Sequence, residues 1–392
     1  MVMISKPNQT KLRIMKKVIL IPVHLFLLIA TLFSQETTAP PEVPPGWWMI
    51  PKTSTKIKLG GYVKLDLIYD LDPIGSPDFF DVSKIPVDGS EGTSTHFHIK
   101  ETRLYLDAKT PFKNSEIRTY IEGDFFGTSG AFRVRHAFVD IADKLLVGQY
   151  WSNFMDESII PPTLDYEKPA AYAFARHAML RWKHKFSDAT YLGVAIEEPS
   201  SNAIAPTEPG HYENPLPDLT ARFRFTKTWG HVQLSGFGGQ IRYRFNTGEK
   251  EDISLFGGNL SGQINLLKKD KLIYQALYGP GVGRYRGGFS AAPDDNGDLK
   301  AVTGMGYTIG YQHFWSDDWS SYIMYNYGSN DTSEDEPDTT IKAVSYIAAN
   351  LIWHFTHNAF AGIEYLYGTR EDVDGADGDA NRVQMSVSYT FN

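Results

Sequence analysis

The stretch 382-RVQMSVSYTF-391 alternates polar and apolar side chains without interruption. Arg382, Gln384, Ser386, Ser388 and Thr390 occupy one set of positions, and Val383, Met385, Val387, Tyr389 and Phe391 occupy the other. Neighbouring side chains of a β-strand point to opposite faces, so the stretch predicts a strand with one polar and one apolar face. Its length exceeds the ~5–6 residues of a typical soluble strand. It matches the ~9–11 residues with which a tilted strand crosses a bilayer.

The same alternation recurs along the chain, for example in 57-IKLGGYVKLDLIY-69 and 116-EIRTYIEGDF-125. It predicts sixteen strands, at 56–70, 97–109, 115–126, 131–141, 144–150, 175–184, 190–197, 218–227, 231–245, 253–266, 271–279, 302–313, 319–327, 341–354, 358–369 and 381–391. Every second connection is short, and most of the others are long: 71–96, 151–174, 198–217, 280–301, 328–340 and 370–380. Short turns at one end and long loops at the other are typical of outer-membrane barrels. The fold class we predict is all-β, a transmembrane antiparallel β-barrel of about 16 strands.

Composition agrees with this class. The chain has 392 residues, 14% aromatic residues, 34 glycines and no cysteine, which excludes disulfides and thiol chemistry. After the N-terminus, no run of 18 apolar residues occurs, so a helical membrane protein is excluded. Aromatic residues near the short turns predict a girdle in contact with outer-membrane lipid: Phe112, Phe186, Trp229, Phe314, Trp315, Trp319 and Phe355.

The N-terminus reads as a targeting segment. Basic residues precede the apolar run 18-VILIPVHLFLLIATLF-33, and Ser34 follows it, so residues 1–34 are predicted to be a cleaved signal peptide. A membrane-anchoring helix is the alternative. We expect residues 35–55, rich in proline, to form a periplasmic segment, and residues 56–392 to form the barrel of an exported protein.

Arginine alternates with aromatic residues in 132-FRVRH-136, 220-TARFRFTKTWG-230, 241-IRYRF-245 and 284-RYRG-287. An arginine on the lipid face costs about 2–4 kcal/mol near the bilayer centre, so strand arginines are expected to face the pore. The candidate pore-lining residues are Arg103, Arg118, Arg133, Arg135, Arg176, Arg181, Arg222, Arg224 and Arg382. Rings of arginine favour anions. In 231–245, apolar residues and arginines share one parity, and a β-bulge at Gly238-Gly239 would reverse the facing.

The connection 151–174 mixes acidic and apolar residues and contains two adjacent prolines. We expect it to fold into the barrel as a constriction loop, with Trp151, Phe154, Asp156, Glu157 and Asp165 as its key residues and its acids facing the arginines. A loop packed outward, or at a contact between subunits, is the alternative.

The stretch 147-VGQYWSNFMDES-158, the arginine-rich strands before it and the aromatic last strand resemble the DcaP-like family of trimeric outer-membrane porins. The resemblance implies sixteen-stranded monomers, a homotrimer and passage of small anions, dicarboxylates among them. Some family members carry an N-terminal coiled coil, whereas residues 35–55 lack heptads.

The function we predict is passive diffusion of small anionic solutes, carboxylates and dicarboxylates among them, through an arginine-lined pore. A general diffusion porin is the alternative, and an outer-membrane enzyme is a further one, although no Gly-x-Ser-x-Gly motif occurs. No cofactor, metal site or catalytic residue is predicted: His96 and His98 lack a third ligand, and 372-DVDGADGDA-380 lacks the closing glutamate of a calcium loop. With a formal net charge of -8, an exported chain is not expected to bind nucleic acid.

Overall fold

The computed structural model describes residues 43–166, 171–200, 203–267, 269–294, 297–332 and 340–391. Residues Pro44–Asn392 form one compact unit, the one described below. The predicted signal peptide 1–34 and residues 35–42 of the proline-rich segment lie outside the described residues.

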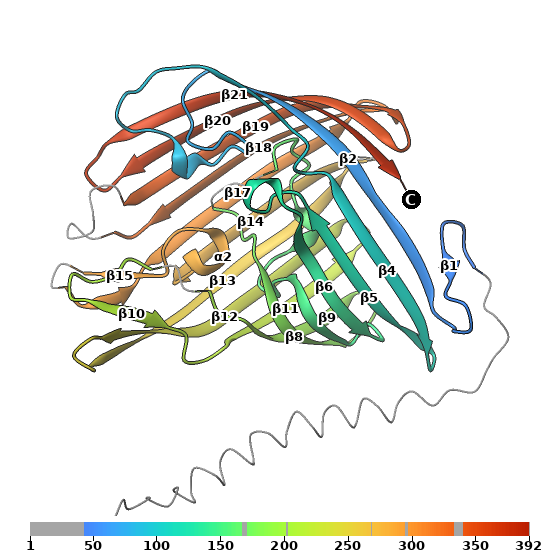
Figure 1. Ribbon diagram of the computed structural model, residues 1–392, viewed down its shortest axis with the longest axis horizontal. Coiled ribbons are helices and arrows are strands. Elements are labelled where there is room, and N and C mark those ends of the chain that lie inside the picture. Colours follow the sequence, from blue (N-terminus) through green and yellow to red (C-terminus); the bar gives the residue numbers. More distant parts are fainter. Residues whose placement is uncertain are drawn as a thin grey trace, which may run out of the picture. The chain divides into compact units, whose positions relative to one another are not determined.

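Sixteen antiparallel strands form a closed barrel (Figure 1), as the alternation predicts. They are β2 (Lys56–Asp70), β4 (Arg103–Phe112), β5 (Ser115–Asp124), β6 (Arg133–Ile141), β7 (Leu145–Trp151), β8 (Arg176–Lys185), β9 (Thr190–Glu197), β11 (Asp218–Lys227), β12 (Gly230–Phe245), β13 (Lys250–Leu266), β14 (Asp270–Pro280), β17 (Thr303–Phe314), β18 (Trp319–Asn330), β19 (Ile341–Thr356), β20 (Ala359–Asp372) and β21 (Asp377–Phe391). The first and last strands close the ring, with Gly61 opposite Phe391 and Asp70 opposite Arg382. The stretch 382–391 therefore lies in the closing strand.

Shorter elements extend the barrel or lie in its loops. They are β1 (Trp48–Met49), β3 (Ser94–His98), β10 (Gly210–Glu213), β15 (Ala291–Pro293), β16 (Leu299–Ala301), η1 (Val82–Lys84), η2 (Thr128–Gly130), η3 (Glu157–Ile159) and α2 (Gly283–Arg286). Among the described residues, no helix is long and apolar enough to span a membrane.

Two of the predicted boundaries are wrong. The strand predicted at 97–109 is two strands, β3 and β4, which pair with different halves of β2. The predicted long connection 370–380 is instead the tip of the β20–β21 hairpin, whose pairing continues to Glu371 and Asp377. At 97–109 the pairing with β2 is interrupted between His98 and Arg103, whereas in the hairpin it continues beyond the residues that the apolar alternation marks.

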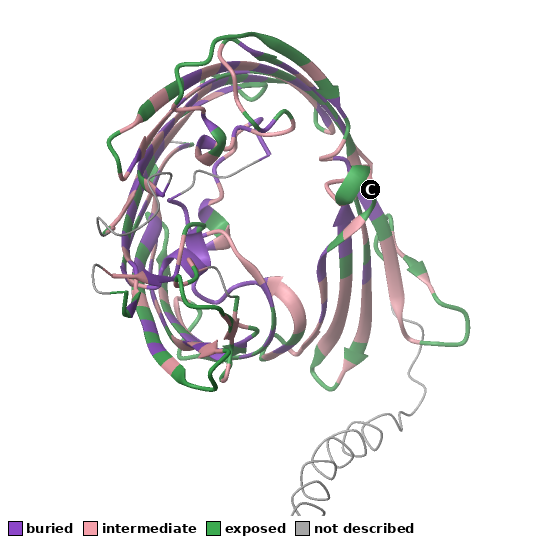
Figure 2. Ribbon diagram, turned by 60° about the vertical axis from the view of Figure 1, so that its left-hand side comes forward, coloured by how far each residue is buried: buried purple, intermediate pink, exposed green. Residues whose placement is uncertain are grey.

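The apolar face of the strands points away from the barrel. Large apolar side chains that lie on this face, such as Leu234, Phe256 and Ile323, are more than half exposed. At the short-turn end, Phe186 and Trp315 are exposed in the same way. Figure 2 shows exposed and buried residues alternating along the strands, with buried segments inside the ring. A band of apolar residues flanked by aromatic residues is the surface that a lipid bilayer solvates.

Strand β12 contains no bulge at Gly238-Gly239, because its register with β13 runs unbroken from Gly230 to Arg244. The expectation that a bulge reverses the facing is wrong. Arg242 and Arg244 instead share the outward parity of Leu234, close to the end of the strand, where Arg242 pairs with Asp252.

A bulge occurs instead between β5 and β6. Glu122 lies opposite His136 and Gly123 lies opposite Val134, which leaves Arg135 as the extra residue. The buried side chains of Arg135 and His136 are consequently adjacent in sequence and both face inward. A bulge re-aims side chains in this way, and it concentrates charge on the inner wall.

Candidate functional site

The connection between β7 and β8, residues 152–175, is held at its start by one buried carboxylate. Glu197, on β9, accepts hydrogen bonds from the Ser152 hydroxyl and from the backbone N–H of Asn153, both at 2.7 Å. It also accepts one from the hydroxyl of Thr220 on β11 at 2.8 Å. The β7–β8 loop is therefore tied to the inner wall as soon as it leaves the strand.

A second buried carboxylate holds the middle of the β7–β8 loop. Glu364, on β20, accepts from the backbone N–H groups of Leu164 and Asp165 at 3.0 and 2.8 Å. The Leu164 carbonyl accepts from Gln384 of β21 at 3.0 Å and from Lys64 of β2 at 2.5 Å. The strands that carry the two anchoring carboxylates, β9 and β20, are far apart in the strand order.

Between these anchors the loop packs on other inward-facing positions. The Phe154 carbonyl accepts from Ser235 on β12 and from Asn259 on β13. Ala171 lies over Gly306 and Gly328, a cross-strand pair on β17 and β18. A Cβ on either glycine would come within 2.5 Å of Ala171, so these positions require glycine. The loop thus crosses the interior of the barrel, and its residues contact inward-facing side chains on most sides.

A first group of arginines lies on β4, β5, β6 and the start of β8: Arg103, Arg118, Arg133, Arg135 and Arg176. Arg118 forms a two-point contact with Asp107, both nitrogens at 2.9 Å. Arg133 and Arg135 both pair with the fully buried Asp124, at 2.7 and 2.9 Å. Arg135 also donates at 2.8 Å to the hydroxyl of Tyr166, so the loop contacts the charged wall directly.

A second group, Arg181, Arg222 and Arg224, faces the acids of the β7–β8 loop. Arg222 pairs with Glu157 at 2.8 Å, and Arg224 pairs with Asp156 at 2.9 Å. Burial opposes the charge of Asp156, but the hydrogen bond from His231 and the charge of Arg224 hold its pKa well below its usual range. Burial likewise opposes the charge of Glu157, while Arg222 and Arg181 lower its pKa. Both acids are therefore ionised at neutral pH.

Arg176 and Arg181 differ from the other members of the two groups. Within the part of the chain that the structure describes, neither forms an ion pair, and each has a buried Nη1 without a hydrogen-bond acceptor. Each guanidinium instead lies over an aromatic ring, Arg176 at 5.0 Å from the centre of Trp151 and Arg181 at 5.2 Å from that of Tyr150. Neither guanidinium therefore has a carboxylate at ion-pair distance among the described residues, and the acid whose charge acts on Arg181, Glu157, is paired with Arg222.

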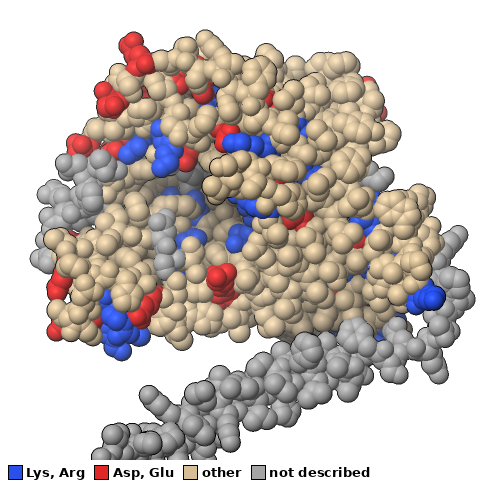
Figure 3. Space-filling model, in the orientation of Figure 1, with Lys and Arg blue, Asp and Glu red and all other residues tan. Residues whose placement is uncertain are grey.

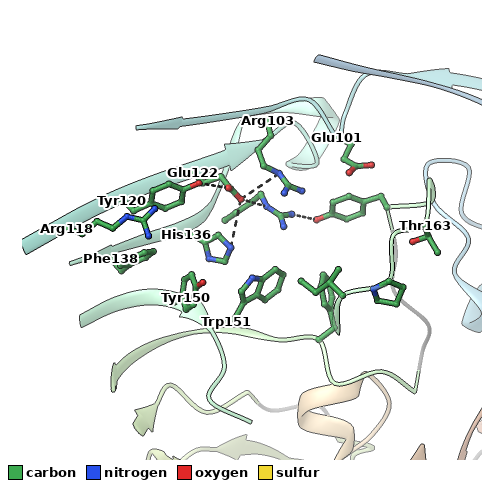
Figure 4. Close-up of a pocket in the computed structure, with 15 residues that line it drawn as sticks. Glu101, Arg103, Arg118, Tyr120, Glu122, His136, Phe138, Tyr150, Trp151 and Thr163 are labelled. Atoms are coloured by element: carbon green, nitrogen blue, oxygen red, sulfur yellow. Dashed lines mark hydrogen bonds and ion pairs between the residues drawn. The ribbon is translucent and has the colours of Figure 1, made fainter. Parts of the chain in front are cut away.

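A cavity of about 400 Å³ opens beside the first group (Figure 4). Arg103 and Arg118 line it together with Glu122, and Tyr150 and Trp151 form an aromatic wall. On the face drawn in Figure 3, Lys and Arg side chains gather in and around a hollow. The wall thus offers cationic and aromatic surface to a solute.

The remaining predicted residues lie apart from this cavity. Arg382 is fully buried, pairs with Asp70 at 2.5 Å and donates to the Ser76 carbonyl at 2.8 Å, so it does not reach a water-filled passage. Asp165 accepts a hydrogen bond from the Phe80 N–H at 3.0 Å. Phe154 is completely buried against Phe237 and Tyr285. These three residues hold the β7–β8 loop and the adjoining loops in place.

Several residues of the site escape the sequence patterns. The alternation marks Glu122 and Asp124 as inward, on the face of Arg118, but it does not reveal their pairing with β6. Glu197 and Glu364 sit at inward positions without any motif. The signal that could identify them is a carboxylate on an otherwise apolar or neutral inner face.

The histidine pair does not form a metal centre in the described residues. His96 contacts the Asp78 carboxylate at 2.9 Å and His98 contacts the Asp78 carbonyl at 2.7 Å. No group of three or more metal-binding side chains occurs among the residues that the structure describes.

Comparison with known proteins places this barrel among outer-membrane channels. The outer-membrane channel DcaP of Acinetobacter baumannii superimposes with a TM-score of 0.77 at 23% identity, over 88% of this chain and 99% of that one. An anion-selective porin from Comamonas acidovorans gives 0.59 at 11% identity, over 86% and 100%. The trimer form of OmpT of Vibrio cholerae gives 0.54 at 12% identity, over 86% and 99%. No curated protein matches the sequence.

At these identities the structural neighbours establish the fold alone. The family described as DcaP outer membrane protein matches residues 32–391, nearly the whole chain. Its name and the barrel fold place the protein in the outer membrane of a Gram-negative cell. The chain belongs to the DcaP outer membrane protein family.

Proposed function

We propose that this outer-membrane channel conducts small anionic solutes, carboxylates and dicarboxylates among them, in preference to cations. The observation that carries the proposal is the pair Arg176 and Arg181, which lack a carboxylate partner among the described residues while the other arginines of both groups have one. Charges inside a water-filled passage bounded by protein act through the local field rather than through the net charge of the chain. Two guanidinium groups without an ion-pair partner among the described residues therefore attract anions.

The β7–β8 loop sets the size limit in this proposal. It is tied to Glu197 and Glu364, and it occupies part of the barrel interior. Glu157 and Asp156 of the loop neutralise Arg222 and Arg224, so the second group contributes less to anion attraction than its number of arginines indicates. Solutes would pass beside the first group, where the cavity of about 400 Å³ lies.

The second candidate is a general diffusion porin with weak charge preference, which the many arginine–carboxylate pairs favour. Reversal potentials across planar bilayers with a salt gradient separate the two. The proposal requires a clear preference for chloride over potassium. A preference for potassium, or none, would support the general porin. The family and the structural neighbours are channels rather than enzymes, and we propose no catalytic activity.

We further propose that the chain is exported by residues 1–34 and assembles as a homotrimer in outer-membrane lipid. Support comes from the apolar run 18–33 and from the trimer form among the structural neighbours. The mass of the detergent-solubilised protein tests the assembly: a monomeric mass contradicts it. N-terminal sequencing of the mature protein tests the cleavage, which predicts a start near Gln35.

A further inference from the structure

A second cavity, of about 330 Å³, shares no lining residue with the cavity beside the first arginine group. Its walls come from η1 and the residues before it, from the end of α2, and from β18 and β19. These elements belong to the loop end of the barrel, where α2 lies within the ring of strands (Figure 1). A solute entering from the loop side passes this part of the wall.

Two cations line this cavity, Arg286 and Lys342, and within the described ranges Lys342 has an ion pair whereas Arg286 has none. The side chain of Arg286 is 6% exposed, and Nη2 donates to the Ser329 carbonyl at 3.0 Å and to the Asn330 amide oxygen. Nε is buried without a hydrogen-bond acceptor. Burial lowers the pKa of Arg286 to about 10, so the guanidinium is still charged at neutral pH.

The neighbouring arginine shows how such a charge is neutralised elsewhere in the same helix. Arg284 pairs with Asp218, and both side chains are fully buried. Asp218 also accepts from Tyr285 at 3.0 Å. Arg284 therefore holds α2 to the wall, and Arg286 is left with donors that this contact does not use.

Two glycines leave room for the guanidinium of Arg286. A Cβ at Gly304 would lie 2.6 Å from Nη2, and a Cβ at Gly328 would lie 3.1 Å from Nη1. Both glycines lie on the inner faces of adjacent strands, β17 and β18. The guanidinium thus occupies a slot that only glycine leaves open, which fixes its position relative to the cavity.

The rest of the cavity is mostly apolar or already paired. Phe80, Val82 and Val344 contribute apolar surface. Asp81 accepts from the Ser83 hydroxyl at 2.6 Å, and Lys342 donates to Glu371 at 2.7 Å. One buried, unneutralised cation beside an apolar wall is complementary to an anion that carries an apolar body.

We propose that this mouth cavity, centred on Arg286, is a binding subsite for small carboxylates with an aromatic or aliphatic body, which are held there before they pass the first arginine group. The inference rests on the proposed anion selectivity and names a substrate class within it. The carboxylate would lie against Nη1 of Arg286, since Nη2 already donates to Ser329 and Asn330 and Nε is buried. The apolar body would contact Val82 and Val344. The cavity volume lies at the lower end of the range for small-molecule sites, which suits a solute the size of benzoate.

Binding of benzoate to the purified full-length channel in detergent, measured by calorimetry, tests this subsite. Acetate and neutral benzamide are the comparison probes. Benzoate is expected to bind, and acetate and benzamide to bind much more weakly. Arg286→Gln should weaken benzoate binding roughly tenfold or more, because charged hydrogen bonds are lost. Ser83→Glu, which leaves the bonds of Arg286 intact and adds a competing carboxylate, should do the same. Arg242→Gln is the matched control, because it removes an arginine that pairs with Asp252 outside the cavity, and it should change the affinity little. Lys342→Gln removes the cavity's other cation, which already pairs with Glu371, and should weaken binding far less than Arg286→Gln.

Heat-dependent mobility in gels establishes that each variant is a folded barrel. Equal benzoate affinity in wild type, Arg286→Gln and Ser83→Glu would overturn the subsite. Loss of binding in Lys342→Gln but not in Arg286→Gln would also overturn it, because Lys342 and not Arg286 would then be the residue that binds benzoate. Reversal potentials of the same samples separate this failure from that of the proposed function. A wild-type channel that prefers chloride but binds benzoate independently of Arg286 refutes the subsite only, whereas a channel without anion preference refutes both.

Discussion

Glu157 of the β7–β8 loop pairs with Arg222 of β11 at 2.8 Å, and the carboxylate also reaches Nη2 at 3.4 Å. The pair joins a loop residue to a strand that lies three barrel strands beyond β7. Its carboxylate cancels one of the inward-facing positive charges. In the proposed channel, charge selectivity would depend on the balance between paired and unpaired arginines and not on the number of arginines.

Glu157→Gln should raise the preference for anions. The substitution keeps the shape of the side chain and leaves the charge of Arg222 uncompensated. We expect the chloride-to-potassium permeability ratio to rise severalfold, because a stronger positive field inside the barrel raises the local concentration of anions. Reversal potentials measure the ratio. Asp143→Asn is the matched control, because Asp143 pairs with Lys183 and Lys185 at an exposed short turn. An unchanged ratio in Glu157→Gln would argue that Arg222 does not face the ion path.

Glu364→Ala should release the middle of the β7–β8 loop. The amide N–H groups of Leu164 and Asp165 would lose their acceptor, at about 1–3 kcal/mol for each unsatisfied group. We expect a larger and noisier single-channel conductance, because the loop then leaves its place in the barrel. Glu371→Ala removes a carboxylate from an exposed pair with Lys342 and should leave conductance unchanged. Wild-type conductance in Glu364→Ala would contradict the role of the loop in setting the size limit.

The attachment of Asp156 predicts the pH dependence of the channel. Its pKa is lower in the folded protein than in the unfolded chain, where a carboxyl titrates near ~3.9. The pair with Arg224 therefore contributes its full stability above about pH 4 and loses it as pH falls through the lower, folded value. Conductance should stay constant from pH 7 to about pH 4 and change only in stronger acid.

The variant Asp156→Asn provides the comparison. It lacks the charge that holds Arg224 and His231, so its loop attachment should be weaker at every pH, and its conductance should already differ from wild type at pH 7. A transition between pH 5 and 7 that occurs in wild type but not in Asp156→Asn would contradict the assignment, because Asp156 remains ionised throughout that range.

The alternation of side chains predicts most of the fold because one face of each membrane-spanning strand meets lipid and the other meets the polar interior of the barrel. Strand 381–391 is found as Asp377–Phe391, and strand 190–197 is found with the same bounds. The pattern ends where the bilayer ends, so it could not reveal the β20–β21 hairpin beyond it. The triplet 284-RYR-286 has the spacing of a strand but lies in α2, where Arg284 pairs with Asp218.

The site was less predictable, because its contacts join residues far apart in the sequence. The alternation places Arg224 on the inner face, but its pairing with Asp156 depends on the path of a loop. The bulge at Arg135 is invisible in the sequence, since Arg133 and Arg135 keep the expected spacing and only the register with β5 changes. Sequence parity therefore identifies inward cations but not the carboxylates that neutralise them.

Leu234→Arg tests the outward face. Leu234 is 60% exposed on β12, and an arginine near the bilayer centre should destabilise the barrel by about 2–4 kcal/mol. Urea titration of the protein folded into lipid vesicles measures the loss. Leu234→Phe, which keeps the site apolar, should have little effect. Equal stability of the arginine variant and wild type would show that this face does not meet the hydrocarbon.

The most direct test of anion selectivity removes the two unpaired cations. The variant Arg176→Gln/Arg181→Gln breaks no ion pair among the described residues, because neither arginine forms one there. Reversal potentials of wild type and variant are compared in planar bilayers under one salt gradient. We predict that wild type prefers chloride and that the variant loses most of this preference. A wild-type channel that prefers potassium, or a variant that keeps the full chloride preference, would contradict the account.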